Sequence, residues 1–248
     1  MNSDLKPYLE LKREMLRAGL FSCSQVGFNI AFGALPRLRA DFAGLFARVF
    51  EATEHWDVPP LIREDWVPAG AWDNPADAQW VRTEPLGHVL TPLPAMHLLN
   101  RLRHHPGSGV FHLSGWCTRR ETDTLPLLRQ IAFSVEERIQ VEQAGGPELH
   151  GPMVFESLVA LAFEMELPVE EALIEGQEGA CLNLQLPDTP NVPLAAFRDA
   201  LPGLLASYGM DWAAVDRVSC GIERWCLALI ARHGTDPASW PDIASLRP

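Results

Sequence analysis

Two stretches of the chain decide its fold class: SGVFHLSGWCT at residues 108–118 and RQIAFSVEERIQVE at residues 129–142. In the second stretch, apolar side chains alternate with polar ones, at Ile131, Phe133, Val135, Ile139 and Val141. This period of two is typical of a strand with one buried face. The proline-bearing segment DTLPLL at residues 123–128 separates the two stretches. We therefore predict an antiparallel hairpin with a long loop.

Helices are expected on both sides of this hairpin in the sequence. The clearest is RLRADFAGLFARVFEATE at residues 37–54, whose apolar residues form one helical stripe. Further helices are predicted at residues 4–19, 152–167, 194–207 (interrupted at Pro202) and 222–233, and further strands at residues 180–187 and 213–220. Residues 56–95 are rich in Trp and Pro and are expected to be irregular or to form short extended pieces. Antiparallel strands flanked by helices define an α+β fold, and we predict one domain over residues 1–248.

Charge and composition argue against a nucleic-acid-binding, a disulfide-bonded, a membrane and a secreted protein. The chain carries 32 acidic and 20 basic residues, a net charge of −12, which disfavours binding to a nucleic-acid backbone. Its five cysteines include no CxxC pair, so they are expected to be buried thiols. There is no apolar run long enough to span a membrane and no secretory signal. A cytoplasmic protein is therefore expected.

Two further segments point to a chemistry. The first is CTRRE at residues 117–121, which a loop separates from Phe133 and Glu137. The second is GIER at residues 221–224, which opens a predicted helix that is followed by HGTDPASWP at residues 233–241. Each segment places an arginine next to or close to a glutamate in the sequence, at the edge of a predicted strand or helix.

These segments resemble motifs 2 and 3 of the class II aminoacyl-tRNA synthetase catalytic core. The narrower resemblance is to the seryl-tRNA synthetase-like amino acid:carrier-protein ligases, which are class II cores without a tRNA-binding domain. It is strong over residues 111–141 and 217–241 and patchy elsewhere. It implies an antiparallel sheet flanked by helices, and a homodimer formed through motif 1, whose proline is Pro59 or Pro60.

The resemblance also implies residue roles in activating an amino acid with ATP. Arg119 would hold the α-phosphate and the substrate carboxylate, and Glu121 would accept a hydrogen bond from the adenine amino group. Phe133 would stack under the adenine, and Arg224 would cover its other face and pair with the γ-phosphate, with Glu223 in the same nucleotide site. Simpler readings remain open for each residue: a surface ion pair between Arg119 and Glu121, a core position for Phe133, and solvent-facing helix positions for Glu223 and Arg224.

The chain departs from these ligases at the metal that receives the substrate amino group. The ligases hold zinc with a Cys, a Glu and a Cys, which align with His97, Glu137 and Arg217 here. His97 and Glu137 are the candidate metal ligands, but an arginine cannot bind a metal. We therefore predict that zinc is absent. Arg217 would replace its charge and either pair with Glu137 or bind an acidic group on an altered substrate, so these three residues form the predicted substrate site.

Two more departures concern ATP and its Mg²⁺. Asn183 aligns with the glutamate that helps to bind magnesium, and loss of a carboxylate weakens such a site. Glu136 aligns with a second motif-2 arginine, so less positive charge is expected beside the phosphates.

Two functions from different classes follow from this pattern. The first is an ATP-dependent ligase that activates an amino acid or a related carboxylic acid and transfers it to a carrier-protein thiol or to an amine, not to tRNA. The second is a degenerate synthetase relative that acts as a binding or regulatory protein. An acyltransferase that uses a pre-activated acyl donor is an intermediate reading. We expect the ligase, because the residue types at Arg119, Glu121, Phe133 and Arg224 are all retained.

Overall fold

The predicted hairpin forms the centre of a computed structural model of the chain. Strand β7 (Gly109–Thr118) pairs antiparallel with β8 (Ala132–Gln143), from Gly109 opposite Val141 to Thr118 opposite Ala132. The structure describes residues 6–23, 29–66, 82–83, 87–91, 93–118, 132–143, 146, 148–176, 179–187, 193–199, 205–206, 208–210 and 213–247. The predicted loop at residues 123–128 lies outside these described residues, as do Arg119 and Glu121.

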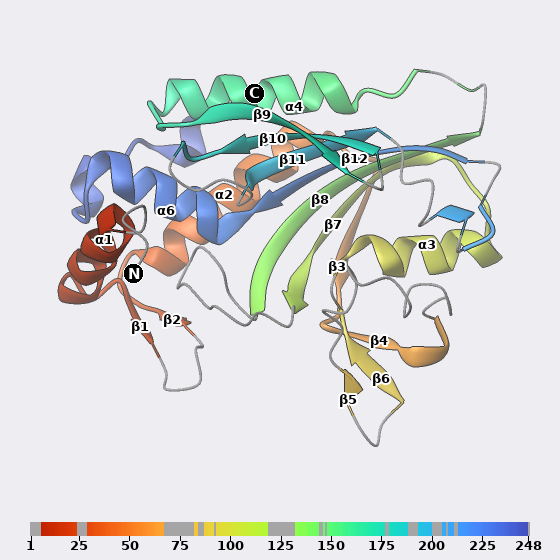
Figure 1. The fold of residues 1–248 in the computed structure, drawn as a ribbon, viewed down its shortest axis with the longest axis horizontal. Coiled ribbons are helices and arrows are strands. Elements are labelled where there is room, and N and C mark those ends of the chain that lie inside the picture. Colours follow the sequence, from red (N-terminus) through yellow and green to blue (C-terminus); the bar gives the residue numbers. More distant parts are fainter. Residues whose placement is uncertain are drawn as a thin grey trace.

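The hairpin belongs to a seven-stranded sheet with the order β3-β7-β8-β12-β11-β10-β9 (Figure 1). The further strands are β3 (Glu54–Val58), β9 (Glu170–Gly176), β10 (Gly179–Gln185), β11 (Pro193–Asp199) and β12 (Ala213–Gly221). All neighbours are antiparallel except β3, which runs parallel to β7. The predicted α+β class is therefore confirmed.

Three helices cover one face of this sheet: α2 (Leu35–Phe50), α4 (Gly151–Glu164) and α6 (Ile222–His233). Trp225 of α6 is fully buried, and its ring lies against Phe42 and Phe46 of α2, with centroids 5.7 and 5.3 Å away. Its Nε1 donates to the Leu194 carbonyl oxygen of β11 at 3.0 Å. This side chain therefore fixes both helices to the sheet. Helix α6 ends at Gly234, whose φ of 83° suits glycine.

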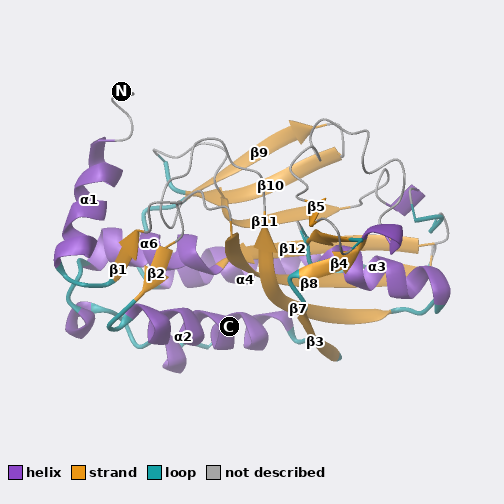
Figure 2. Ribbon diagram, turned by 90° about the horizontal axis from the view of Figure 1, so that it is seen from below, coloured by secondary structure: helices purple, strands orange, loops and turns teal. Residues whose placement is uncertain are grey.

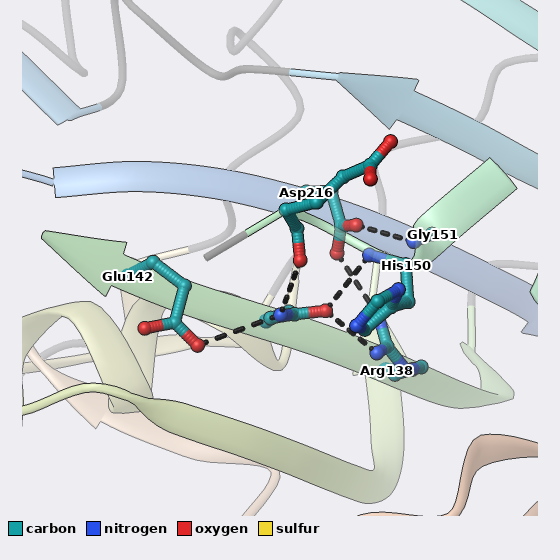
Figure 3. Close-up of polar contacts among 7 residues, drawn as sticks. Arg138, Glu142, His150, Gly151 and Asp216 are labelled. Carbon is teal, nitrogen blue, oxygen red and sulfur yellow. Dashed lines mark hydrogen bonds and ion pairs between the residues drawn. The ribbon is translucent and has the colours of Figure 1, made fainter. Parts of the chain in front are cut away.

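A buried polar network joins the start of α4 to this same face (Figure 3). Arg138 of β8 pairs with Asp216 of β12 at 3.0 Å and donates to Gln140 at 2.9 Å. The backbone N–H of Gly151 donates to the other Asp216 oxygen, and the N–H of His150 donates to Gln140 at 3.0 Å. The Asp216 carboxylate and the Gln140 side-chain amide thus accept hydrogen bonds from backbone N–H groups at the start of α4. These bonds to β8 and β12 fix the orientation of the helix on the sheet.

Smaller elements complete the molecule at its two ends. Helix α1 (Lys6–Arg17) and the pair β1 (Phe21–Cys23) and β2 (Asn29–Ala31) lie at one end (Figures 1 and 2). The opposite end holds α3 (Ala95–His104) and a small sheet of β4 (Leu61–Arg63), β6 (His88–Leu90) and β5 (Arg82–Thr83), and a 3₁₀ turn at Glu64–Trp66 follows β4. Two more 3₁₀ turns follow α6, at Pro237–Ser239 and Ile243–Ser245. Helix α3 packs on the second face of the large sheet, through Leu98 and Leu102 against a core that includes Ile139 and Val215.

No helix in the described ranges is long and apolar enough to cross a membrane.

One predicted element is wrong and others differ at their ends. Residues 193–199 form strand β11, where we predicted a helix over residues 194–207. The extended conformation is favoured over the helix because this segment forms backbone hydrogen bonds on both sides, with β10 and with β12. The helix predicted over residues 37–54 ends at Phe50, because Glu51 adopts a φ of 44° and Glu54 begins β3. The other predicted helices and strands are confirmed, with shifts of a few residues at their ends.

Candidate active site

The sheet face that is free of α2, α4 and α6 carries a cavity of about 330 Å³. This volume lies at the lower end of the range for small-molecule sites. Because side chains alternate along a strand, most of the lining comes from every second residue of neighbouring strands. These residues include Phe133, Val135 and Glu137 of β8, Arg217, Ser219 and Gly221 of β12, Ala196 and Arg198 of β11, and Cys181 and Asn183 of β10.

One end of the cavity holds the residues predicted to bind the nucleotide. Phe133 of β8 and Arg224 in the first turn of α6 both line it, beside Gly221 and Pro193. The Arg224 guanidinium donates to the Pro193 carbonyl oxygen at 2.8 Å. An aromatic ring and a planar cation at one end of a cavity are suited to bind a purine and its phosphates.

Glu223 does not line the cavity, although it was predicted to belong to the nucleotide site. Its carboxylate accepts from the Ser134 hydroxyl at 2.6 Å and from the Ser134 N–H at 3.1 Å, and it pairs with Arg39 of α2 at 3.0 Å. The residue is 4% exposed. Glu223 therefore joins α6 to β8 and α2, and in doing so it positions the neighbouring Arg224.

At the other end of the cavity, Glu137 and Arg217 form an ion pair. Arg217 Nε donates to Glu137 Oε1 at 3.0 Å, and a second guanidinium nitrogen donates to the same oxygen. Glu137 Oε2 accepts from the N–H of Ala95 at the start of α3, at 2.9 Å. Of the two arrangements expected for Arg217, the structure shows the pairing with Glu137. Both carboxylate oxygens are thus engaged by protein donors.

His97 is not brought into the cavity. It lies in α3 with its Nε2 3.1 Å from Thr91 Oγ1. The Thr91 hydroxyl lies within hydrogen-bond distance of the Pro59 carbonyl oxygen as well, at 3.0 Å, and its oxygen can accept from Nε2 in the tautomer that carries the proton there. Burial lowers the pKa of His97 from 6.5 to about 4. This histidine is a buried structural residue.

The residues present do not fit a zinc ion of the expected kind. The Glu137 carboxylate already accepts hydrogen bonds from Arg217, and the His97 side chain is hydrogen-bonded to Thr91 outside the cavity. Within the described part of the chain, no group of three or more His, Cys, Asp or Glu side chains is placed to hold a metal. Asn183, which aligns with the magnesium-binding glutamate of the ligases, lines the cavity, and its Oδ1 accepts from Cys181 Sγ at 3.1 Å.

The expectation for Glu136 needs correction. Glu136 accepts from Ser114 at 2.8 Å and lies 2.6 Å from His112 Nε2, on the face opposite the cavity. Because neighbouring residues of a strand point to opposite faces, Glu136 cannot lie beside phosphates that Phe133 and Glu137 would face. It therefore does not lower the positive charge of the site.

Arg198 is a cavity residue that sequence reasoning missed. It lies on β11 directly opposite Arg217 of β12. The error has one cause, since the predicted helix hid the alternation that brings Ala196 and Arg198 to one face. Pro193 and Pro202 bracket eight residues, a length typical of a strand, and that spacing was the available signal.

Comparison with solved structures identifies the fold as that of class II aminoacyl-tRNA synthetase catalytic cores. The Giardia lamblia prolyl-tRNA synthetase in complex with prolyl-adenylate has a TM-score of 0.77 at 11% identity, over 97% of this chain and 56% of that one. The M. kandleri seryl-tRNA synthetase, solved with A. aeolicus tRNASec, has a TM-score of 0.71 at 14% identity, over 94% and 59%. The Cryptosporidium parvum prolyl-tRNA synthetase with halofuginone and AMPPNP has a TM-score of 0.69 at 11% identity, over 90% and 52%.

The class II fold expected from the two sequence motifs is thereby confirmed. The chain spans between 52 and 59% of the length of these synthetases. No protein-family profile matches the sequence, and no curated protein is found to be related to it.

Proposed function

We propose that this protein uses ATP to activate an amino acid or a related carboxylic acid as its acyl adenylate. The observation that carries the proposal is one cavity on a class II synthetase fold, lined by Phe133 and Arg224 at one end and by Arg217 and Glu137 at the other. Two of the similar synthetases were solved with prolyl-adenylate and with AMPPNP, which are the product and substrate classes of this reaction.

The reaction would be an in-line displacement at the α-phosphorus. A carboxylate oxygen of the acid attacks the α-phosphorus, the bond to the β-phosphate oxygen breaks, and pyrophosphate leaves. Arg224 would neutralise phosphate charge at the Phe133 end of the cavity, and Arg119, by the motif-2 resemblance, would hold the α-phosphate beside the acid. Fixed guanidinium groups suit this work because they remain charged and need no reorganisation during the reaction. Mg²⁺ would arrive with ATP and screen the phosphate charges.

The acyl acceptor in this proposal is a carrier-protein thiol or an amine, not tRNA. The acceptor atom attacks the acyl carbon, and AMP leaves. The net charge of −12 supports this choice, because the protein's field repels a polyanion such as tRNA. The resemblance to amino acid:carrier-protein ligases also supports it, and the same resemblance implies that the protein acts as a homodimer.

A binding protein, or an acyltransferase that accepts a pre-activated acyl donor, is the second candidate. It is favoured by Asn183, which lines the cavity in place of a magnesium-binding carboxylate. Neither of these proteins would need to bring the acid and ATP together.

The test is ATP–pyrophosphate exchange over a panel of amino acids and related acids, with and without Mg²⁺. The variants are Arg119→Ala and Arg224→Ala, with Arg37→Ala as control, because Arg37 is 86% exposed on α2. We expect exchange that requires one class of acid, falls at least roughly 100-fold in both site variants and is unchanged in the control. If no acid supports exchange while ATP still raises the melting temperature, the second candidate is correct. If ATP does not affect the melting temperature, the nucleotide site is refuted.

A further inference from the structure

Two arginines lie side by side on the cavity floor. The register of β11 and β12 puts Arg198 directly opposite Arg217, and both side chains line the cavity. Like charges at directly opposed positions of an antiparallel pair destabilise the sheet. Such a local conflict is typical of a functional site, where a ligand relieves it.

The protein neutralises one of these two charges. Glu137 is fully buried and engages Arg217 through Oε1, while its Oε2 accepts from the N–H of Ala95. Across the described ranges, Arg198 has no hydrogen bond or ion pair with any side chain, and Glu137 is the sole carboxylate that lines the cavity. This end of the cavity therefore carries a net positive charge at the half-buried Arg198.

This positive end is distant from the end suited to the nucleotide. Phe133 precedes Glu137 by four residues on β8, and Gly221 follows Arg217 by four residues on β12. At 3.2–3.4 Å per residue the two ends are about 13 Å apart. Asn183, Ala196 and Ser219 line the floor between them. A nucleotide held by Phe133 and Arg224 would thus bring its phosphates toward the middle, and the acid would occupy the Arg198 end.

We propose that Arg198 binds a second anionic group on the acid, so that the substrate is a dicarboxylic acid or an acidic amino acid. This inference rests on the proposed function and names its substrate class. A neutral side chain would leave the Arg198 guanidinium in the cavity without a counter-ion. A site built around a charged hydrogen-bond donor rejects an analogue that lacks the partner, because the donor is then left unpaired.

The experiment uses acid pairs that differ in charge and little in shape: glutamate with glutamine and aspartate with asparagine, with succinate as an acid that has no amino group. Each is measured in ATP–pyrophosphate exchange and, separately, by calorimetric binding to the protein saturated with a non-hydrolysable ATP analogue. The variants are Arg198→Gln and Arg198→Lys, with Arg37→Gln as a matched loss of a surface arginine. ATP binding to each variant is measured alone.

We expect the charged member of at least one pair, or succinate, to be preferred by roughly 10- to 100-fold. Arg198→Gln should abolish that preference without changing ATP binding, Arg198→Lys should retain part of it, and Arg37→Gln should match the wild type. Calorimetric preference that depends on Arg198 supports the inference even if no acid supports exchange, which would refute only the proposed function. If neutral acids support ATP–pyrophosphate exchange and Arg198→Gln leaves that exchange unchanged, the inference is overturned and the proposed function is retained. If Arg198→Gln weakens ATP binding and leaves acid preference intact, the anion is a phosphate and the inference is wrong.

Discussion

Arg217 and Glu137 form a buried ion pair between neighbouring strands at one end of the cavity. Glu137 is 0% exposed and Arg217 is 9% exposed, and the pair spans β12 and β8. Two of the three positions that align with zinc ligands of the carrier-protein ligases thus hold a cation and an anion that pair with each other.

Loss of one partner should be more damaging than loss of both. Arg217→Met leaves the Glu137 carboxylate buried with only the Ala95 N–H, and we expect the free energy of unfolding to fall by about 3–5 kcal/mol. The double variant Glu137→Leu/Arg217→Met removes both charges and should lose less than the single variant. Urea denaturation of Arg217→Met, of Glu137→Leu and of the double variant measures the energetic coupling between the two side chains. Additive losses would show that the two side chains do not depend on each other.

Zinc should neither stabilise this protein nor be retained by it. The two Glu137 oxygens already accept hydrogen bonds, and Arg217 would repel a cation. Treatment with a chelator should leave the melting temperature unchanged, and addition of zinc should not raise it. Elemental analysis of the purified protein is the second readout. Stoichiometric zinc in the purified protein, together with a lower melting temperature after chelation, would show that the protein does bind zinc.

Phe133 should contribute to nucleotide affinity. Its ring lines the cavity beside Arg224, and stacking of a base on an aromatic side chain is worth about 1–3 kcal/mol. Phe133→Ala should therefore weaken AMP and ATP binding by roughly 10- to 100-fold in calorimetry. Phe32→Ala is the control, because Phe32 is an exposed phenylalanine outside the cavity lining. Equal affinity of Phe133→Ala and wild type would place the base elsewhere.

The sequence predicted the centre of the fold because its signals there are local. Alternation over β8, and a strand followed by GIER and an apolar helix, are readable without knowledge of any distant contact. Residues 193–199 are different, since Leu-Ala-Ala-Phe-Arg suits a helix and becomes a strand only by pairing with β10 and β12. Arg198 was missed for that reason.

The candidate site was predictable in residue types but not in which way each side chain faces. Alignment made Glu136 a phosphate neighbour and His97 a candidate ligand, yet the pleat turns Glu136 to the other face and α3 buries His97 against Thr91. Glu223 and Arg224 are adjacent in the sequence but diverge, because successive helical residues point about 100° apart. Such directions depend on packing between elements, which sequence order does not specify.

His97 should make the protein less stable in mild acid. Burial lowers the pKa of its imidazole from 6.5 to about 4, so between these values the unfolded chain binds a proton that the folded protein does not. The resulting stability is fully present above about pH 6.5 and is lost as the pH falls toward 4. It amounts to about 3 kcal/mol. Urea unfolding at pH 7 and pH 4.5 measures the loss.

The comparison that isolates this histidine is with His97→Gln, which retains a donor for Thr91 but does not titrate. The difference in unfolding free energy between pH 7 and pH 4.5 should be smaller in His97→Gln than in the wild type, although the variant is less stable at pH 7 through imperfect packing. His104→Gln is the control, since His104 lies exposed at the end of the same helix, and it should follow the wild type. The same pH dependence in His97→Gln and wild type would mean that other buried groups cause the acid sensitivity and that the neutral, buried state of His97 is wrongly assigned.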